Sequence, residues 1–188
     1  MSSTKDALFK VLLTGVTKGT RLRASPTPAD RRAAFAAGVV VLWSSFVVPS
    51  IAQEKAVYVA KGSFEVNIKP SKEADEADGV SLGRFDLEKG FSGDLIGTSE
   101  GEMLTARTAT EGSAGYVAIE RFTGSLKGLA GTFVLQHTGT MQAGDQTLAI
   151  SIVPDSGTGE LSGISGNFQL RIEGGDHYYE LEYSLGDG

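Results

Sequence analysis

The feature that most constrains the fold is the stretch from Gly115 to Met141, GYVAIERFTGSLKGLAGTFVLQHTGTM. Two runs in which apolar and polar residues alternate lie on either side of a short segment that contains glycine and leucine. Side chains of a β-strand point to opposite faces in turn, so each run predicts a strand and the segment between them predicts a turn. The stretch therefore predicts a β-hairpin within an all-β fold.

A turn over residues 126–129 pairs Ser125 with Ala130 and sets the register of this hairpin. The face predicted to point inward then holds Tyr116, Ala118, Glu120, Phe122, Phe133, Leu135 and His137. The opposite face carries more polar side chains, among them Arg121 and Gln136. Changing the turn length by one residue would exchange the two faces of one strand, so the assignment of the inner face depends on this turn.

Segments in which apolar and polar residues alternate, or in which glycines are spaced along the chain, lie on both sides of the hairpin. Strands are predicted over residues 56–68, 80–87, 91–108, 167–172 and 177–185, with a charged loop over 69–79 and a turn at 88–90. A turn over Ala143 to Gln146 pairs Met141 with Leu148 and places 148, 150 and 152 on the inner face. Six to eight antiparallel strands with one apolar face close into a barrel or stack as a sandwich, and the short turns favour the barrel.

The 188 residues suffice for one domain with a sizeable core, and 25 glycines suit many strands joined by tight turns. Residues 1–53 carry seven Lys/Arg and two acids, a formal charge of +5. Residues 54–188 carry ten Lys/Arg and 21 acids, a formal charge of −11. Because nucleic-acid binding needs a basic surface, the acidic part is not expected to bind nucleic acid.

The first 53 residues read as a leader. Residues 1–32 are basic and end in Arg31-Arg32, and residues 33–48 are an uncharged run. Small residues then occupy the −3 and −1 positions of a signal-peptidase cleavage site after Ala52. This order predicts a leader helix within a signal peptide and an exported barrel, periplasmic or extracellular, from residue 54 to 188. Two alternatives stay open: an uncleaved membrane anchor through residues 33–48, and a mis-assigned start with a cytoplasmic protein.

The chain contains no cysteine, and His137 and His177 are its two histidines. Disulfides, thiolate metal sites and a cysteine nucleophile are therefore excluded, and two imidazoles are too few for an all-histidine zinc site. The acidic loop over residues 69–79 lacks the ligand spacing of an EF-hand. The sequence therefore predicts no metal and no cofactor.

Three runs resemble a known family: GTSEGEMLTART, GSAGYVAIERFTGSLKGLAGTFVLQHTGTM and IVPDSGTGELSGISG. They are similar to a bacterial domain-of-unknown-function family with an allene-oxide-cyclase-like, or calycin-like, barrel. The resemblance covers about residues 55 to 186. It implies an eight-stranded antiparallel barrel, often a homodimer, without an assigned activity. No motif here carries a cyclase's catalytic residues, so the link to cyclases stays an analogy of fold.

Glu120 and His137 are the candidate catalytic residues, because the predicted register places both on the apolar inner face. A buried carboxylate must be paired or neutralised, and a Glu–His pair in an apolar pocket can transfer protons. Tyr116, Tyr179 and Glu102 complete the predicted ligand-binding set. Two alternatives stay open. Glu120 can be an ordinary structural or surface ion-pair residue beside Arg121, and Glu102 can face solvent rather than Glu120.

The predicted function is burial of a small, mainly apolar molecule inside the barrel, oriented by Tyr116, Glu120 and His137. The first alternative is a cyclase- or isomerase-type enzyme that uses the Glu–His pair in the same pocket. The second is a structural or interaction barrel whose interior is filled by its own side chains.

Overall fold

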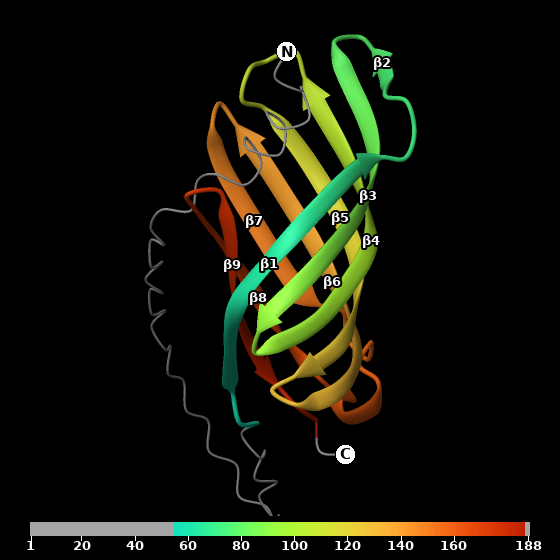
Figure 1. The fold of residues 1–188 in the computed structure, drawn as a ribbon. Helices are drawn as coiled ribbons and strands as arrows, with labels where there is room; N and C mark the ends of the chain where they lie inside the picture. The colour runs from blue at the N-terminus through green and yellow to red at the C-terminus, as the bar shows by residue number, and fades with distance from the viewer. Residues whose placement is uncertain (1–54, 187–188) are drawn as a thin grey trace, which may run out of the picture. The chain divides into compact units, whose positions relative to one another are not determined.

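The computed structural model describes residues 55–186 (Figure 1), which contain nine strands and one short 3₁₀ helix. In chain order they are β1 (Tyr58–Pro70), β2 (Asp75–Ala77), β3 (Val80–Gly93), β4 (Leu95–Thr108), β5 (Ala114–Leu126), β6 (Leu129–Gln142), β7 (Asp145–Ile152), η1 (Gly159–Leu161), β8 (Ser165–Glu173) and β9 (Asp176–Ser184). The expected all-β class is confirmed.

Eight of these strands, all except the three-residue β2, close into an antiparallel barrel. The strand order is β1-β9-β8-β7-β6-β5-β4-β3-β2, and a further pairing between β1 and β3 closes the ring. β1 achieves this by changing partner along its length: it pairs with β9 from Tyr58 to Phe64 and with β3 from Gly62 to Pro70. Closure removes the exposed edges that an open sheet would leave.

The predicted register of the central hairpin is confirmed. Ser125 pairs with Ala130, and Glu120 lies opposite Leu135. The turn residues Lys127 and Gly128 both have positive φ, 49° and 89°, which suits a two-residue hairpin turn. Phe122, Phe133 and Leu135 are fully buried, so the face predicted to point inward does so.

The next hairpin differs from the prediction by two residues. Its turn is Ala143-Gly144, with φ of 50° and 94°, so Met141 pairs with Gln146 and Leu148 pairs with Gly139. Because two residues are one full period of a strand, Ile150 and Ile152 still point inward.

The turn predicted at residues 88–90 is wrong. β3 runs unbroken through these residues to Gly93, and the reversal of the chain occurs at Asp94. Asp94 stabilises this reversal by accepting a hydrogen bond from the backbone N–H of Lys61. The triplet Glu88-Lys89-Gly90 resembles a turn because it is polar, but the barrel supplies an interior partner for Lys89.

The two halves of the barrel interior are packed differently. The end that holds the β5–β6 turn is at the bottom of Figure 1 and is called the lower end; the β6–β7 and β8–β9 turns lie at the upper end. The lower half is filled by large side chains that contact one another: Phe91, Leu95, Phe122, Leu126, Phe133, Leu161, Ile164 and Leu181. Leu161 of η1 and Ile164 come from the β7–β8 connection, which plugs this end.

The wall of the barrel is not equally paired all round. β5 and β6 share a ladder from Ala114–Met141 to Leu126–Leu129, whereas β7 and β8 share the single pair Ser151–Asn167. Ile150 of β7 and Phe168 of β8, which face inward, lie on the two strands of this sparsely paired seam.

The predictions for the leader fall on residues outside the described part of the chain. Among residues 55–186, no helix is long and apolar enough to cross a membrane. The structure describes one chain, so the homodimer stays a prediction.

Candidate functional site

Four polar side chains form a buried cluster on the inner wall, one from each of four neighbouring strands. Glu120 of β5 is at its centre. Its Oε1 lies 2.6 Å from Nζ of Lys89 on β3 and 2.9 Å from Nε2 of His137 on β6. Its Oε2 accepts a hydrogen bond of 2.9 Å from Oγ of Ser99 on β4. The carboxylate therefore has a partner on each oxygen, as a buried charge requires.

Strand register places these groups side by side. Lys89 lies directly opposite Ser99 across β3–β4, and Glu120 lies opposite Gly101 across β4–β5. Gly101 leaves the space over which the Glu120 side chain passes, since a Cβ there would lie 2.6 Å from Cβ of Glu120. Small residues on β4 thus let the carboxylate reach the ammonium on the strand beyond.

The cluster holds Glu120 ionised. Burial acts to raise the pKa of this carboxyl, but the attraction of Lys89 and the hydrogen bond from His137 outweigh burial and lower it to about 2. The Lys89 ammonium also lies 4.9 Å from the centre of the Phe64 ring, a cation–π contact. The pair is therefore Lys⁺–Glu⁻ at neutral pH.

His137 is held neutral in the same cluster. Burial lowers its pKa, the hydrogen bond to Glu120 opposes this, and the Lys89 charge adds to the lowering. An ionised carboxylate can only accept, so Nε2 of His137 carries the hydrogen that is donated to Glu120. The other ring nitrogen, Nδ1, is then a hydrogen-bond acceptor.

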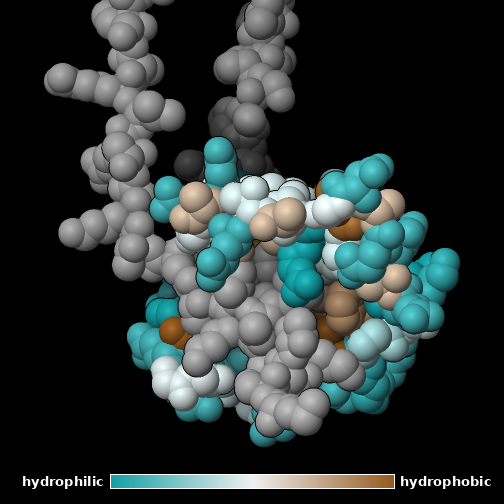
Figure 2. Space-filling view, turned by 90° about the horizontal axis from the view of Figure 1, so that it is seen from above, coloured by the Kyte–Doolittle hydropathy of each residue, from teal (hydrophilic) through white to brown (hydrophobic). Residues whose placement is uncertain are grey.

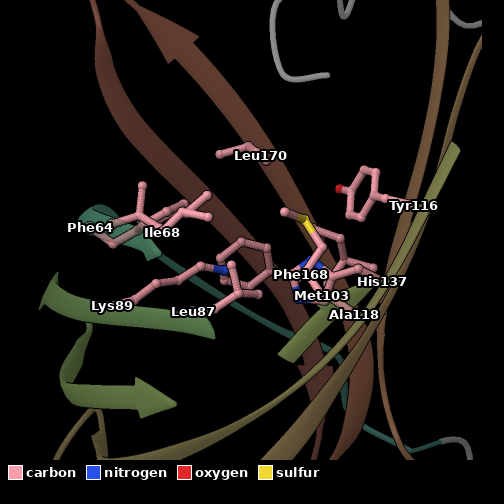
Figure 3. Close-up of a pocket in the computed structure, with 12 residues that line it drawn as sticks. Phe64, Ile68, Leu87, Lys89, Met103, Tyr116, Ala118, His137, Phe168 and Leu170 are labelled. Atoms are coloured by element: carbon pink, nitrogen blue, oxygen red, sulfur yellow. The ribbon is translucent and has the colours of Figure 1, made fainter. Parts of the chain in front are cut away.

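An apolar cavity of about 40 Å³ lies against this cluster in the upper half of the barrel (Figure 3). Its wall is formed by Phe64, Val66, Ile68, Leu87, Lys89, Met103, Tyr116, Ala118, His137, Ile150, Phe168 and Leu170. In Figure 3 the Lys89 side chain extends from β3 toward His137 among these apolar groups. Glu120 is 1% exposed and does not line the cavity, so it acts through Lys89 and His137.

Tyr116 brings a further polar group to the cavity. Its ring packs on Gly139, where a Cβ would overlap it, and its hydroxyl points into the cavity (Figure 3). Tyr116 as a whole is 8% exposed, its hydroxyl keeps access to solvent, and within residues 55–186 this hydroxyl has no hydrogen-bond partner. Burial, and then the negative charge of Glu120, raise the pKa of Tyr116 to about 12.

The cavity is reached from the upper end of the barrel. Val66, Ile68 and Leu170 line it and are only partly buried, so the apolar surface continues toward solvent at this end. Figure 2 views this end and shows hydrophobic residues recessed between hydrophilic residues of the rim.

The remaining predicted site residues lie elsewhere. Tyr179 belongs to the packed core, and its hydroxyl accepts a hydrogen bond of 2.7 Å from the backbone N–H of Leu95. Glu102 lies on the outer surface, where it pairs with Arg84 at 2.6 Å. The structure thus brings Tyr116, Glu120 and His137 together and leaves Tyr179 and Glu102 outside the cavity.

Sequence reasoning missed Lys89 and Ser99. A signal for Lys89 was present, because Phe85, Leu87, Lys89 and Phe91 alternate and would share one inner face of a continuous strand. The polar triplet at residues 88–90 obscured that alternation. Ser99 carries no signal of its own, since its role depends on the register between β4 and its neighbours.

The described residues contain no group of three or more His, Asp or Glu side chains arranged to hold a metal ion. The charges in the cluster are compensated within it, with Lys89 as the cation. The chemistry available at the cavity is therefore hydrogen bonding from Lys89 and Tyr116 and proton transfer through His137.

Known proteins similar to this chain share its barrel. Residues 60–183 match the family described as proteins of unknown function, DUF3224. The crystal structure of a protein with unknown function from the DUF3224 family of Shewanella oneidensis MR-1 shows 45% sequence identity and a TM-score of 0.68. That match covers 71% of this chain and 100% of the other. No curated protein matches. The family match over residues 60–183, together with the eight-stranded barrel, shows that this chain belongs to the DUF3224 family.

Proposed function

We propose that the barrel binds a small, mainly apolar molecule in the upper half of its interior. The observation that carries this proposal is the apolar cavity into which the Tyr116 hydroxyl points without a protein hydrogen-bond partner among the described residues. A hydroxyl that points into an apolar cavity and makes no hydrogen bond to the protein can donate one to a bound molecule. Apolar walls with a few placed polar groups are typical of sites for small molecules.

The contrast between the two halves of the barrel supports the same proposal. The lower half is filled by its own side chains, as expected for a barrel of structural function. The upper half instead leaves a cavity beside Lys89, a residue type that is rarely buried without need. A buried ion pair that shifts a carboxyl pKa beside a cavity is typical of functional sites.

The test is a titration of the protein with pentane, followed by NMR shifts of the cavity methyl groups. The wild type is expected to show saturable shifts of Leu87, Met103 and Ile150. Ala118→Leu fills the cavity from its wall and is expected to abolish them. The neighbouring Val117 is exposed on the outer surface, so Val117→Leu serves as the matched control. If pentane shifts no cavity residue, the barrel is a structural one.

One observation favours an isomerase as a second candidate. His137 is held neutral, and its hydrogen bond to Glu120 leaves Nδ1 as a base. A neutral imidazole can remove a proton from carbon next to a carbonyl while Lys89 or Tyr116 stabilises the resulting oxyanion. The test is deuterium exchange into methyl butyl ketone in D₂O, which His137→Gln should abolish. No exchange above the rate without protein would leave binding alone.

A further inference from the structure

We infer that the molecule bound in the cavity carries a neutral carbonyl group, whose oxygen accepts hydrogen bonds from Tyr116 and Lys89. The inference rests on the proposed function and names the chemistry of the ligand's polar end. It follows from three properties of the cavity: its donors, its net charge and its size.

Two hydrogen-bond donors line the cavity. The Tyr116 hydroxyl has a hydrogen to donate and no partner among the described residues. The Lys89 ammonium has three hydrogens, and Glu120 is its acceptor within residues 55–186. Lys89 and Tyr116 both line this cavity of about 40 Å³, and we place one ligand oxygen between them. A carbonyl oxygen has two lone pairs and can accept from both at once.

Charge distinguishes a neutral carbonyl from a carboxylate. Lys89 and Glu120 neutralise each other at 2.6 Å, and His137 is neutral, so the cluster beside the cavity carries no net charge. A ligand carboxylate would be buried beside Glu120 without a cation of its own, which is costly. Burial and the charge of Glu120 also raise the pKa of Tyr116, so a further negative charge is disfavoured at this place.

Size sets how the molecule lies. A cavity of about 40 Å³ exceeds the roughly 10–15 Å³ needed for one water molecule but is well below that of a drug-sized site. It therefore takes the carbonyl and its nearest carbons. The rest of an apolar chain would lie along Val66, Ile68 and Leu170 toward the upper end.

Three probes of matched size test the inference by NMR titration: methyl butyl ketone, the alkene in which a methylene group replaces its oxygen, and hexanoate. The wild type should bind the ketone about tenfold more tightly than the alkene, and hexanoate more weakly than the ketone. Tyr116→Phe removes a hydroxyl without a protein partner, so this variant should fold. It should weaken ketone binding about fivefold and leave alkene binding unchanged.

Tyr178→Phe is the matched control, because Tyr178 stacks with Arg171 outside this cavity, and it should change neither affinity. The inference is overturned if the ketone binds no more tightly than the alkene, if hexanoate binds most tightly, or if Tyr116→Phe has no effect. In each of these cases alkene binding leaves the proposed function standing. If no probe shifts the cavity residues, both the inference and the proposed function fail.

Discussion

At the scale of single residues, the cost of burying charge explains the arrangement of the cluster. Glu120 is 1% exposed. Its two carboxylate oxygens accept hydrogen bonds from Lys89, His137 and Ser99, and these bonds stabilise the buried charge. Taking two charges out of water costs several kcal/mol for each ion, which their attraction offsets only when the geometry is close. Such a pair is sensitive to loss of either partner but tolerant of the loss of both.

Lys89→Met should therefore destabilise the protein by about 3–5 kcal/mol, because it leaves Glu120 buried without its cation. The double variant Lys89→Met/Glu120→Gln should recover most of that loss, since both charges are gone. Arg84→Met breaks the exposed Arg84–Glu102 pair and should cost less than about 1 kcal/mol. Urea unfolding measures all three, and a Lys89→Met loss no larger than that of Arg84→Met would contradict the account.

Acid should destabilise the barrel in two stages. The pKa of His137 is lowered by burial, so the unfolded chain takes up a proton below about pH 6.5 before the folded chain does, and stability falls. The pKa of Glu120 is lowered from 4.5 to about 2. Its contribution, about 3 kcal/mol, is complete above pH 4.5 and is lost as the pH falls toward 2.

Urea unfolding of the wild type and of Lys89→Met/Glu120→Gln between about pH 5 and pH 3 measures the second stage. The stability difference between the two proteins should shift against the wild type as the pH falls. Parallel curves over this range would show that Glu120 has an ordinary pKa in the folded protein.

At the scale of elements, the glycines of β4 decide how closely this strand approaches β5. Gly101 lies opposite Glu120, and a Cβ there would meet the backbone of β5 as well as the Glu120 side chain. The missing side chain at Gly101 thus leaves room for the Glu120 carboxylate to pass over β4. Gly90 on β3 differs, since no atom lies within 4 Å of a Cβ built there.

Gly101→Ala should destabilise the barrel by about 1–3 kcal/mol, because the added methyl group forces β4 and β5 apart at the cluster. Gly90→Ala is the matched control and should change stability by less than about 0.5 kcal/mol. Urea unfolding measures both, and the His137 imidazole NMR signals should move in Gly101→Ala alone. Equal effects of the two substitutions would show that the close approach at Gly101 does not matter.

At the scale of the whole molecule, closure makes the barrel self-sufficient. Every long strand between Tyr58 and Ser184 has a neighbour on each side, because β1 pairs with both β9 and β3. Within residues 58–184 the ring therefore has no edge strand, although β7 and β8 share a single ladder pair. The core of the lower half likewise consists of residues from the barrel and the β7–β8 connection.

Residues 55–188 expressed alone should therefore fold, with the same urea midpoint as the full chain and a single cooperative transition. Circular dichroism and urea unfolding make the comparison. A shortened chain that is unfolded or unfolds without cooperativity would show that the first 54 residues contribute to the fold.

The sequence by itself determined the all-β class, the register of the β5–β6 hairpin and the inward placement of Glu120 and His137. These are local properties: a strand alternates with period two, and a tight turn fixes which residues face each other. For the same reason the β6–β7 register could be misjudged by two residues without exchanging its faces.

The tertiary structure alone decided the role of Lys89. In the sequence, Glu88-Lys89-Gly90 is a polar triplet like any turn, and Lys89 is 31 residues from Glu120. The pairing of β3 and of β5 with β4 places the two strands on either side of β4 and brings the two charges together. The size of the cavity was also beyond the sequence, because it depends on how side chains from seven strands fill one interior. Alternation is a property of neighbouring residues, whereas charge pairing and free volume belong to the assembled barrel.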